Sequence, residues 1–208
     1  MEQSKVYVFL SECDYNAPLA ELFPAARGEE IANTKNQRLR CEKQGVWQLL
    51  TFALDRLGQS IESVKPYKTE CGKWCSDSLY FSLSHSDSLL GVAISSEPVG
   101  IDIENIEDFA TRYSDSSHLS GFLDKIRTDN EDNTPTVSNL LSLWTAKESV
   151  YKMLGEGTFS PSKLDTTSYN ITEFKCRSEG KTYHVSLCTN KQLTNPKADV
   201  VIEYIEKK

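Results

Sequence analysis

Apolar residues recur along this chain of 208 residues with two different spacings, and each spacing predicts a different kind of element. Short runs of β-branched and aromatic residues predict strands, over residues 5–10, 79–84, 89–95, 99–104, 169–175, 182–188 and 199–205. Apolar residues three or four positions apart predict long helices over residues 29–57 and 137–154. Residues 108–127 predict one or two short helices, and the polar stretch 128–135 predicts a loop.

The order of these elements predicts an α+β protein with two similar lobes. Each lobe would contain a long helix packed on a small, mainly antiparallel sheet, and a pseudo-two-fold axis would relate the two. We place the boundary after Pro98, so that residues 1–98 form the N-terminal lobe and residues 99–208 the C-terminal lobe. The residues themselves do not repeat between the halves, so the prediction rests on element order alone. A cleft between two lobes is a common place for a ligand.

Composition excludes several classes of protein. Hydrophobic residues make up 38% of the chain and charged residues 25%, which is typical of a globular protein and not of a disordered one. The start, MEQSKVYVFL, is too polar for a signal peptide, and no apolar run is long enough to cross a bilayer, so we expect a cytoplasmic protein without membrane contact. In that compartment most of the six cysteines should be free thiols. The net charge of -7 argues against a nucleic-acid partner.

The predicted helix over 137–154 carries an acid and a base on one face. Glu148 and Lys152 are four residues apart, which places them one turn from each other. By default this is a surface ion pair, which contributes little to stability. The same helix predicts Trp144, Val150, Tyr151 and Leu154 at buried positions. The acid and the base acquire a function only if other segments of the chain require them.

The predicted strand over 99–104 offers two further acids. Asp102 and Glu104 are two residues apart and therefore lie on the same face of the strand. Two such carboxylates repel each other unless a cation lies between them, and Mg²⁺ is a hard cation that also takes phosphate oxygens. An exposed edge strand bearing acids is the simpler interpretation of this pair alone. Gly100, which permits close approach of a ligand or another backbone, and the apolar neighbours favour a site.

Ser84, His85 and Ser86 follow an apolar run, and we expect the turn between two strands at residues 85–88. Hydroxyls, an imidazole and backbone N–H groups together suit an anionic phosphate. Taken alone, a hairpin whose serines bond within their own turn is the better interpretation.

The three segments LSHS (83–86), GIDIE (100–104) and WTAKESVYK (144–152), in this order, resemble the 4′-phosphopantetheinyl transferase superfamily. The length and the two halves resemble its monomeric, surfactin-synthetase-activating type. The resemblance is clear from Gly72 to Gly157, and it implies the two-lobed fold of that family. It also implies a transferase that moves the 4′-phosphopantetheine arm of coenzyme A to a serine of an apo carrier protein and releases adenosine 3′,5′-bisphosphate.

The resemblance also implies the site residues. Mg²⁺, with Mn²⁺ as a possible substitute, would be held by three acids, namely Asp102, Glu104 and Glu148. Coenzyme A would be bound by residues of both lobes, namely Arg40, Lys73, Ser84, His85 and Lys152, with Arg38 as the alternative to Arg40. The catalytic residues would be Glu148 and Lys152. Glu148 would take the serine proton, directly or through water, and Lys152 would stabilise the developing charge.

The resemblance places carrier docking at the segment GTFSPSKLD (157–165), with apolar contacts from Phe159 and Leu164 and from Met153 and Leu154 of the helix. Carrier proteins are usually acidic, so a chain of net charge -7 would attract one only through a local basic patch, with Lys163 and Lys152 as candidates. Lys147 is either a contributor to the site or a surface lysine.

Two other functions fit parts of the pattern. A protein that binds or senses coenzyme A without transferring its arm would not need the three acids and Lys152 together. A different Mg²⁺–nucleotide phosphotransferase is disfavoured because the chain has no GxxxxGK[ST] loop.

Overall fold

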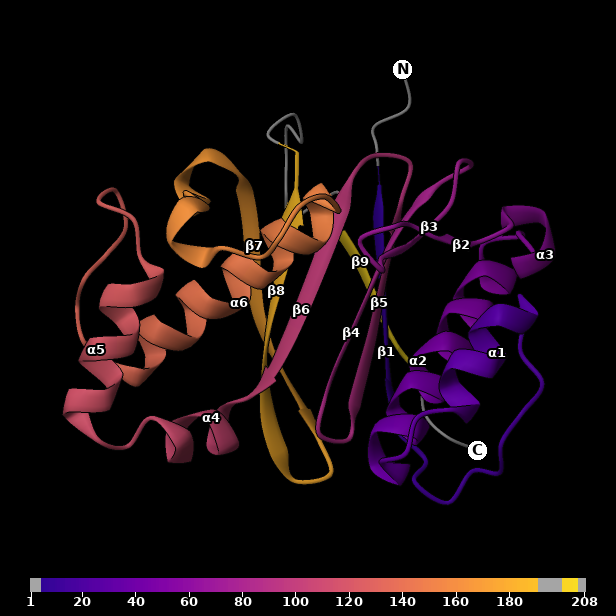
Figure 1. The fold of residues 1–208 in the computed structure, drawn as a ribbon, viewed down its shortest axis with the longest axis horizontal. Helices are drawn as coiled ribbons and strands as arrows, with labels where there is room; N and C mark the ends of the chain where they lie inside the picture. Colours follow the sequence, from indigo (N-terminus) through magenta and orange to yellow (C-terminus); the bar gives the residue numbers. More distant parts are fainter. Residues whose placement is uncertain (1–4, 191–199, 206–208) are drawn as a thin grey trace.

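The computed structural model describes residues 5–190 and 200–205, and in it two long helices enclose two sheets (Figure 1). The larger sheet has the strand order β4-β5-β1-β9 and the smaller has the order β6-β8-β7, while β2 and β3 form a separate hairpin. The strands have the following bounds: β1 Val6–Glu12, β2 Tyr67–Lys68, β3 Trp74–Cys75, β4 Tyr80–Ser86, β5 Leu89–Ser95, β6 Val99–Asn105, β7 Asn170–Ser178, β8 Lys181–Thr189 and β9 Val200–Ile205.

The helices occupy the outer layers and the connections. Their bounds are α1 Ala25–Ala32, α2 Gln37–Arg56, α3 Ile61–Val64, α4 Ile106–Arg112, α5 Ser116–Ile126 and α6 Val137–Leu154, with 3₁₀ turns η1 Pro161–Lys163 and η2 Thr166–Ser168. None of the helices in the described ranges 5–190 and 200–205 is both long and apolar enough to span a membrane.

Successive side chains of a strand point to opposite faces of its sheet, and this alternation determines which layers pack together. In β1, Val8 and Leu10 pack with Ile101 and Ile103 of β6, so the two sheets share an apolar core between them. Phe9, which points to the other face of β1, packs in the cluster under α2. The order of layers is therefore α2, larger sheet, smaller sheet, α6, as Figure 1 shows. This is the predicted α+β architecture, with one long helix packed on each sheet.

Several local predictions differ from the structure. The single helix predicted over 29–57 is two helices, because the polar residues 33–36 leave the helix and the Asn36 side chain caps α2 by accepting the N–H of Leu39. The turn predicted at 85–88 is shorter, since His85 and Ser86 belong to β4. Leu154, predicted to be buried, is 43% exposed, and Met153 is buried in its place.

The last strand joins the first sheet. Residues of β9 pair with β1 in parallel, from Val6 with Val200 to Ser11 with Ile205. Strand β9 therefore extends the sheet of the N-terminal half, although it follows the β7–β8 hairpin in sequence. The halves are consequently joined by this strand as well as by the core between the two sheets.

Candidate active site

The smaller sheet presents two acids to helix α6. Val99, Ile101 and Ile103 of β6 face the core between the sheets, so Asp102 and Glu104 point the opposite way, towards α6. Gly100 lies on this α6 face as well, and a Cβ atom there would be 1.9 Å from the Ser149 carbonyl oxygen of α6. The glycine thus permits the close approach of α6 that brings its side chains to the acids.

Lys152 of α6 forms an ion pair with Asp102 of β6. Its Nζ atom is 2.6 Å from Oδ1 of Asp102 and 3.1 Å from Oγ of Ser84 in β4. The Ser84 hydroxyl in turn donates to Oδ1 of Asp102 at 3.1 Å. Among the ion pairs of the described residues, Lys152 therefore pairs with Asp102 and not with Glu148, and the default i,i+4 surface pair is not formed.

The other two acids, Glu104 and Glu148, both have a raised pKa. Burial raises the pKa of Glu148, and Asp102 and Glu104 raise it further, against the lowering effect of Lys152. Burial likewise raises the pKa of Glu104, and Asp102 adds to this effect. Two largely buried glutamates beside Asp102 thus form a cluster whose negative charge a bound cation would offset.

The donor set fits a hard divalent cation in its chemistry. Carboxylate oxygens are the ligands that Mg²⁺ prefers. As the side chains stand, no three His, Cys, Asp or Glu residues within 5–190 and 200–205 converge closely enough to hold an ion. Of the predicted ligands, Asp102 lies close enough to raise the pKa of both Glu104 and Glu148, but the three are not arranged as a preformed shell.

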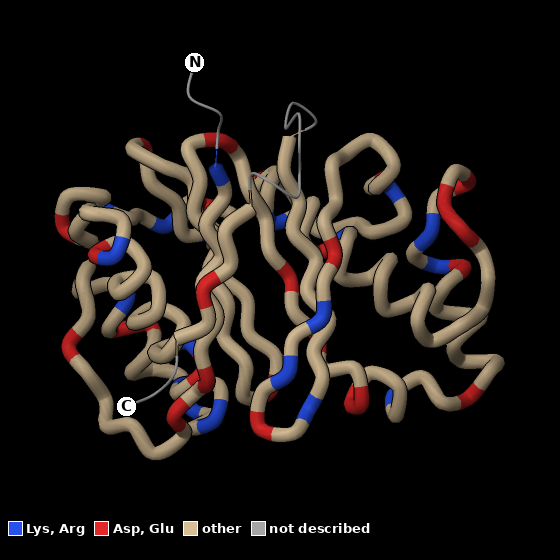
Figure 2. The backbone as a smooth tube through the Cα atoms, turned by 180° about the vertical axis from the view of Figure 1, so that it is seen from behind, with Lys and Arg blue, Asp and Glu red and all other residues tan. Residues whose placement is uncertain are grey.

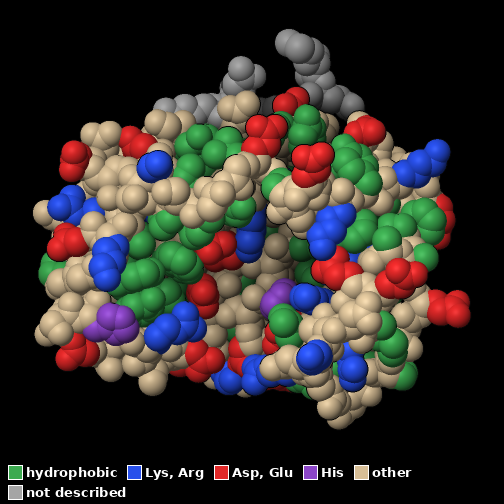
Figure 3. Space-filling view, in the orientation of Figure 1, with side chains coloured by type: hydrophobic (Ala, Val, Ile, Leu, Met, Phe, Trp, Pro, Cys, Tyr) green, Lys and Arg blue, Asp and Glu red, His purple; other side chains and the backbone are tan. Residues whose placement is uncertain are grey.

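The loop at Gly72-Lys73-Trp74 lies against the end of α6. The Lys73 ammonium donates to the carbonyl oxygen of Lys152 and packs against Gly155, and its burial lowers its pKa. Beside it is a cavity of about 300 Å³. The cavity is lined by side chains of the loop, β4 and α6, including Lys73, Trp74, Phe81, Leu83, Tyr151 and Lys152. Figure 3 shows the hollow between the two halves, with acidic, basic and histidine side chains along its walls.

Strand β4 contributes three serines, of which Ser82 and Ser84 lie in the predicted strand and Ser86 was placed in the predicted turn. The hydroxyls of Ser82, Ser84 and Ser86 accept the backbone N–H groups of Ile101, Ile103 and Asn105, at 3.1, 3.1 and 3.0 Å. Serine hydroxyls at alternate positions of β4 thus accept the N–H groups of β6 that the carbonyl oxygens of a paired strand would otherwise accept, and they join β4 to β6. The signal was the alternation in FSLSHS (81–86), which places three hydroxyls on one face.

His85 and Ser86 have separate partners. The Nδ1 atom of His85 is 3.3 Å from Oε2 of Glu42 in α2. The Ser86 hydroxyl donates to Oε2 of Glu104 at 3.4 Å. Ser84 and Ser86 therefore each contact one of the two β6 acids, while His85 points to α2 on the other side.

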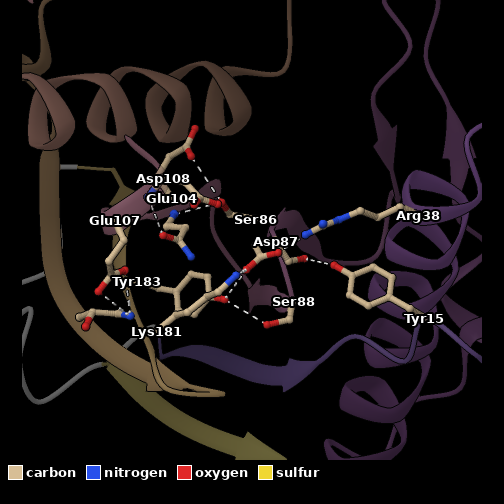
Figure 4. Close-up of polar contacts among 12 residues, drawn as sticks. Tyr15, Arg38, Ser86, Asp87, Ser88, Glu104, Glu107, Asp108, Lys181 and Tyr183 are labelled. Atoms are coloured by element: carbon tan, nitrogen blue, oxygen red, sulfur yellow. Dashed lines mark hydrogen bonds and ion pairs between the residues drawn. The ribbon is translucent and has the colours of Figure 1, made fainter. Parts of the chain in front are cut away.

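The structure distinguishes the two candidate arginines. Arg38 bonds to Glu42 at 3.2 Å and to the carboxylate of Asp87, in the turn after Ser86 (Figure 4). Asp87 also accepts from Lys181 of the β7–β8 hairpin. The N–H of Arg40 donates to the Asn36 carbonyl oxygen, and no hydrogen bond or ion pair is found for the Arg40 side chain within residues 5–190 and 200–205. Arg38, the alternative, therefore shares the Glu42 carboxylate with His85, and the assignment of Arg40 to coenzyme A stays a prediction.

The segment after α6 returns along the helix. Gly155 ends α6 with a positive φ of 71°, as its position predicts. Phe159 then packs against Trp144 at 5.6 Å and against Tyr151 at 5.0 Å between ring centroids. Lys163 is exposed, and Lys147 is fully buried rather than at the surface. His184 is also buried, and its Nε2 atom lies 3.3 Å from Oε1 of Glu173.

Comparison with known proteins agrees with the motifs. A family model described as the 4′-phosphopantetheinyl transferase superfamily matches residues 98–204, just over half of the chain. The 4′-phosphopantetheinyl transferase gsp of Aneurinibacillus migulanus is 35% identical over 101 residues, which are 48% of this chain and 42% of the relative.

Two relatives from Bacillus subtilis are similar to a comparable extent. The 4′-phosphopantetheinyl transferases ffp and Sfp are each 32% identical, over 50% and 49% of this chain and 46% and 45% of their own lengths. The chain thus spans a little under half the length of these curated relatives. The matches confirm the resemblance to their type, and the family model covers β6, α6 and the strands that follow. The chain therefore belongs to the 4′-phosphopantetheinyl transferase superfamily.

Proposed function

We propose that the protein transfers the 4′-phosphopantetheine arm of coenzyme A to a serine hydroxyl of an apo carrier protein, in a Mg²⁺-dependent reaction that releases adenosine 3′,5′-bisphosphate. One observation carries the proposal, namely that Asp102, Glu104, Glu148 and Lys152 meet between β6 and α6. A protein that only binds coenzyme A needs phosphate contacts, and it has no use for three mutually repelling acids beside them.

Coenzyme A would lie across the hollow between the halves. The cavity beside Lys73 and Lys152 offers apolar walls with two ammonium groups. Ser84 and His85 supply a hydroxyl and an imidazole on β4. Arg38 supports a further phosphate contact, because it lies on the His85 side of α2, and we assign the 3′-phosphate to it in preference to Arg40.

The transfer itself needs one proton acceptor and one group that stabilises charge. The serine oxygen forms a bond to the phosphorus that bears the pantetheine arm, and the bond from that phosphorus to the bridging oxygen breaks. Negative charge develops on the leaving oxygen, where the Lys152 ammonium would stabilise it. Glu148 would accept the serine proton, directly or through water.

Asp102, Glu104 and Glu148 would hold the Mg²⁺ ion. When bound, the ion would polarise the pyrophosphate oxygens and offset the charge that accumulates on them. The same ion would relieve the repulsion among the carboxylates, which explains why a protein would retain them side by side.

The carrier protein would approach along the segment that follows α6. Phe159 and the exposed Leu154 provide apolar contacts there, and Lys163 provides a positive charge. Figure 2 shows acidic and basic residues interspersed along the backbone, so the net charge of -7 is not gathered in one part of the molecule. Any attraction of an acidic carrier is therefore local.

Mass spectrometry tests the proposal. A panel of apo carrier proteins incubated with coenzyme A and Mg²⁺ should include members that gain the mass of one phosphopantetheine. Chelation of the metal should stop this gain, and Glu148→Gln should abolish it. Binding of coenzyme A by calorimetry without any mass gain across the panel would contradict the transferase and favour the binding protein.

A further inference from the structure

A buried ion pair lies one residue away from Glu148. The Nζ atom of Lys147 is 2.7 Å from Oε2 and 2.9 Å from Oε1 of Glu131. The two side chains are 0% and 3% exposed. Glu131 belongs to the polar stretch predicted as a loop, so the pair joins that loop to α6 beneath the surface.

The same pair also bonds to the segment after α6. The N–H and hydroxyl of Thr166 donate to Oε1 of Glu131 at 2.9 and 2.7 Å, and the N–H of Thr128 donates to Oε2 at 2.8 Å. The Lys147 ammonium donates to the carbonyl oxygen of Leu164. One ion pair thus fixes three stretches of chain, namely residues 128–131, α6 and residues 164–166.

The segment between Gly155 and Thr166 has few other anchors. Phe159 rests on Trp144 and Tyr151, and Leu164 packs beside Val150 and Met153. None of the residues in the two 3₁₀ turns is buried. A segment with so few buried apolar groups tends to open locally, and the Lys147–Glu131 pair is its interior anchor.

Stability alone does not explain why charge is buried here. Replacing a buried ion pair by apolar side chains of similar volume is often neutral or stabilising, because both charges lose their hydration. Apolar side chains could not accept from Thr128 and Thr166 or donate to Leu164. What the charged pair adds is therefore a fixed position for the backbone at both segments.

We propose that Lys147 and Glu131 are positioning residues for the carrier protein, which hold residues 157–166 as a preformed rim beside Glu148. This inference rests on the proposed function. A rim that is already ordered spares the carrier the cost of ordering it on binding. The pair touches neither the cavity nor the β6 acids, so it acts on the carrier and not on coenzyme A.

Replacement of both residues tests the role without leaving an unpaired charge. In the variant Glu131→Leu/Lys147→Met we expect the KM for the apo carrier to rise about tenfold or more, as the carrier must now order the rim itself. The KM for coenzyme A should not change. Asn130→Ala is the matched control, because it removes an exposed 2.7 Å bond to Asp165 between the same two segments, and it should leave both KM values unchanged.

Unchanged carrier KM in the folded double variant would overturn the inference, and so would an equal rise in both KM values. If the double variant does not fold, hydrogen exchange of the wild-type protein decides. The Thr166 amide should exchange about 100-fold or more slowly than an unstructured amide, and exchange at the unstructured rate would mean that the rim is not held. Absence of any transfer by the wild-type protein would instead refute the proposed function, whatever the exchange result.

Discussion

Replacing Gly100 by alanine tests whether close approach of α6 to β6 builds the site. The added Cβ atom would be 1.9 Å from the Ser149 carbonyl oxygen, 2.6 Å from the Met153 nitrogen and 2.9 Å from the Ser149 carbonyl carbon. All three are backbone atoms of α6, so no flexible side chain can move aside. An ordinary contact needs about 3.4 Å, and the helix must therefore retreat by about 1.5 Å.

The clash should exceed every compensating effect of the substitution. Overpacking a core costs about 1–3 kcal/mol, and we expect about 3 kcal/mol or more here because the helix moves as a body. Alanine restricts the unfolded chain and so recovers at most about 1 kcal/mol. The net result is a loss of free energy of unfolding. A displacement of α6 also moves Glu148 and Lys152 from the β6 acids, and misplacement by about 1 Å lowers a rate on the order of 100-fold.

Urea unfolding measures the first effect, and transfer assayed where the variant is fully folded measures the second. Gly121→Ala is the matched control, because Gly121 is exposed in the middle of α5 and has no atom within 4 Å of an added Cβ. It should stabilise the protein by up to about 1 kcal/mol through helix propensity and leave transfer unchanged. The reasoning is refuted if Gly100→Ala unfolds with the wild-type midpoint and slope.

Three further predictions concern the charged groups. Glu148→Gln should abolish transfer. In urea, the metal-free variant should be as stable as wild type or more stable, because a charge beside Asp102 and Glu104 is removed. Marked destabilisation would contradict repulsion among these carboxylates. Arg38→Ala should raise the KM for coenzyme A but not the KM for dephospho-coenzyme A, which lacks the 3′-phosphate. Arg40→Ala should change neither KM. An effect of Arg40→Ala alone would favour Arg40 as the residue that binds the 3′-phosphate. Glu131→Gln should lower the free energy of unfolding by about 3–5 kcal/mol at neutral pH, since Lys147 loses its partner. Burial alone would raise the pKa of Glu131, but the bonds from Lys147, Thr166 and Thr128 hold it below its usual value, so this contribution is complete above about pH 4.5 and is lost as the pH falls through the lowered pKa. The difference in free energy of unfolding between wild type and Glu131→Gln should therefore be constant from pH 7 to about 4.5 and narrow below it, and a difference that stays constant below pH 4.5 would contradict the assignment.

Elements with strong local periodicity could be predicted from the sequence, including their first and last residues. Helix α6 spans Val137–Leu154 and strand β5 spans Leu89–Ser95, both as the spacing of apolar residues predicts. The break between α1 and α2 was missed because helical spacing continues on both sides of it, and the cap at Asn36 was not recognised as a start signal. Arg38 and Arg40 are two residues apart on α2 and therefore point about 200° apart, but which of them faces the neighbouring strands depends on how the helix packs and not on its spacing.

Long-range contacts lay beyond the sequence pattern. Nothing local to residues 199–205 indicates pairing with β1, because a strand's partner depends on the fold of the whole chain. The sequence left Lys147 open between a site residue and a surface lysine, because its partner, Glu131, lies 16 residues away in a polar stretch. The alternation of serines in β4 is visible in the sequence. That their hydroxyls accept N–H groups of β6 could not be predicted, because it depends on β6 lying beside β4.

Helix α6 unites these features because its successive residues serve different parts of the proposed reaction. Adjacent residues of a helix point about 100° apart, so Lys147 and Glu148 cannot face the same partner. Lys147 is committed to Glu131 in the interior, which leaves Glu148 beside the β6 acids. Lys152, one turn further on, meets Asp102 and Ser84, and Lys73 anchors the loop to the Lys152 carbonyl. The cavity and the rim that follows Gly155 therefore share one rigid element, and a change that moves α6 should affect coenzyme A and carrier together, whereas loosening the Lys147–Glu131 pair should affect the carrier alone.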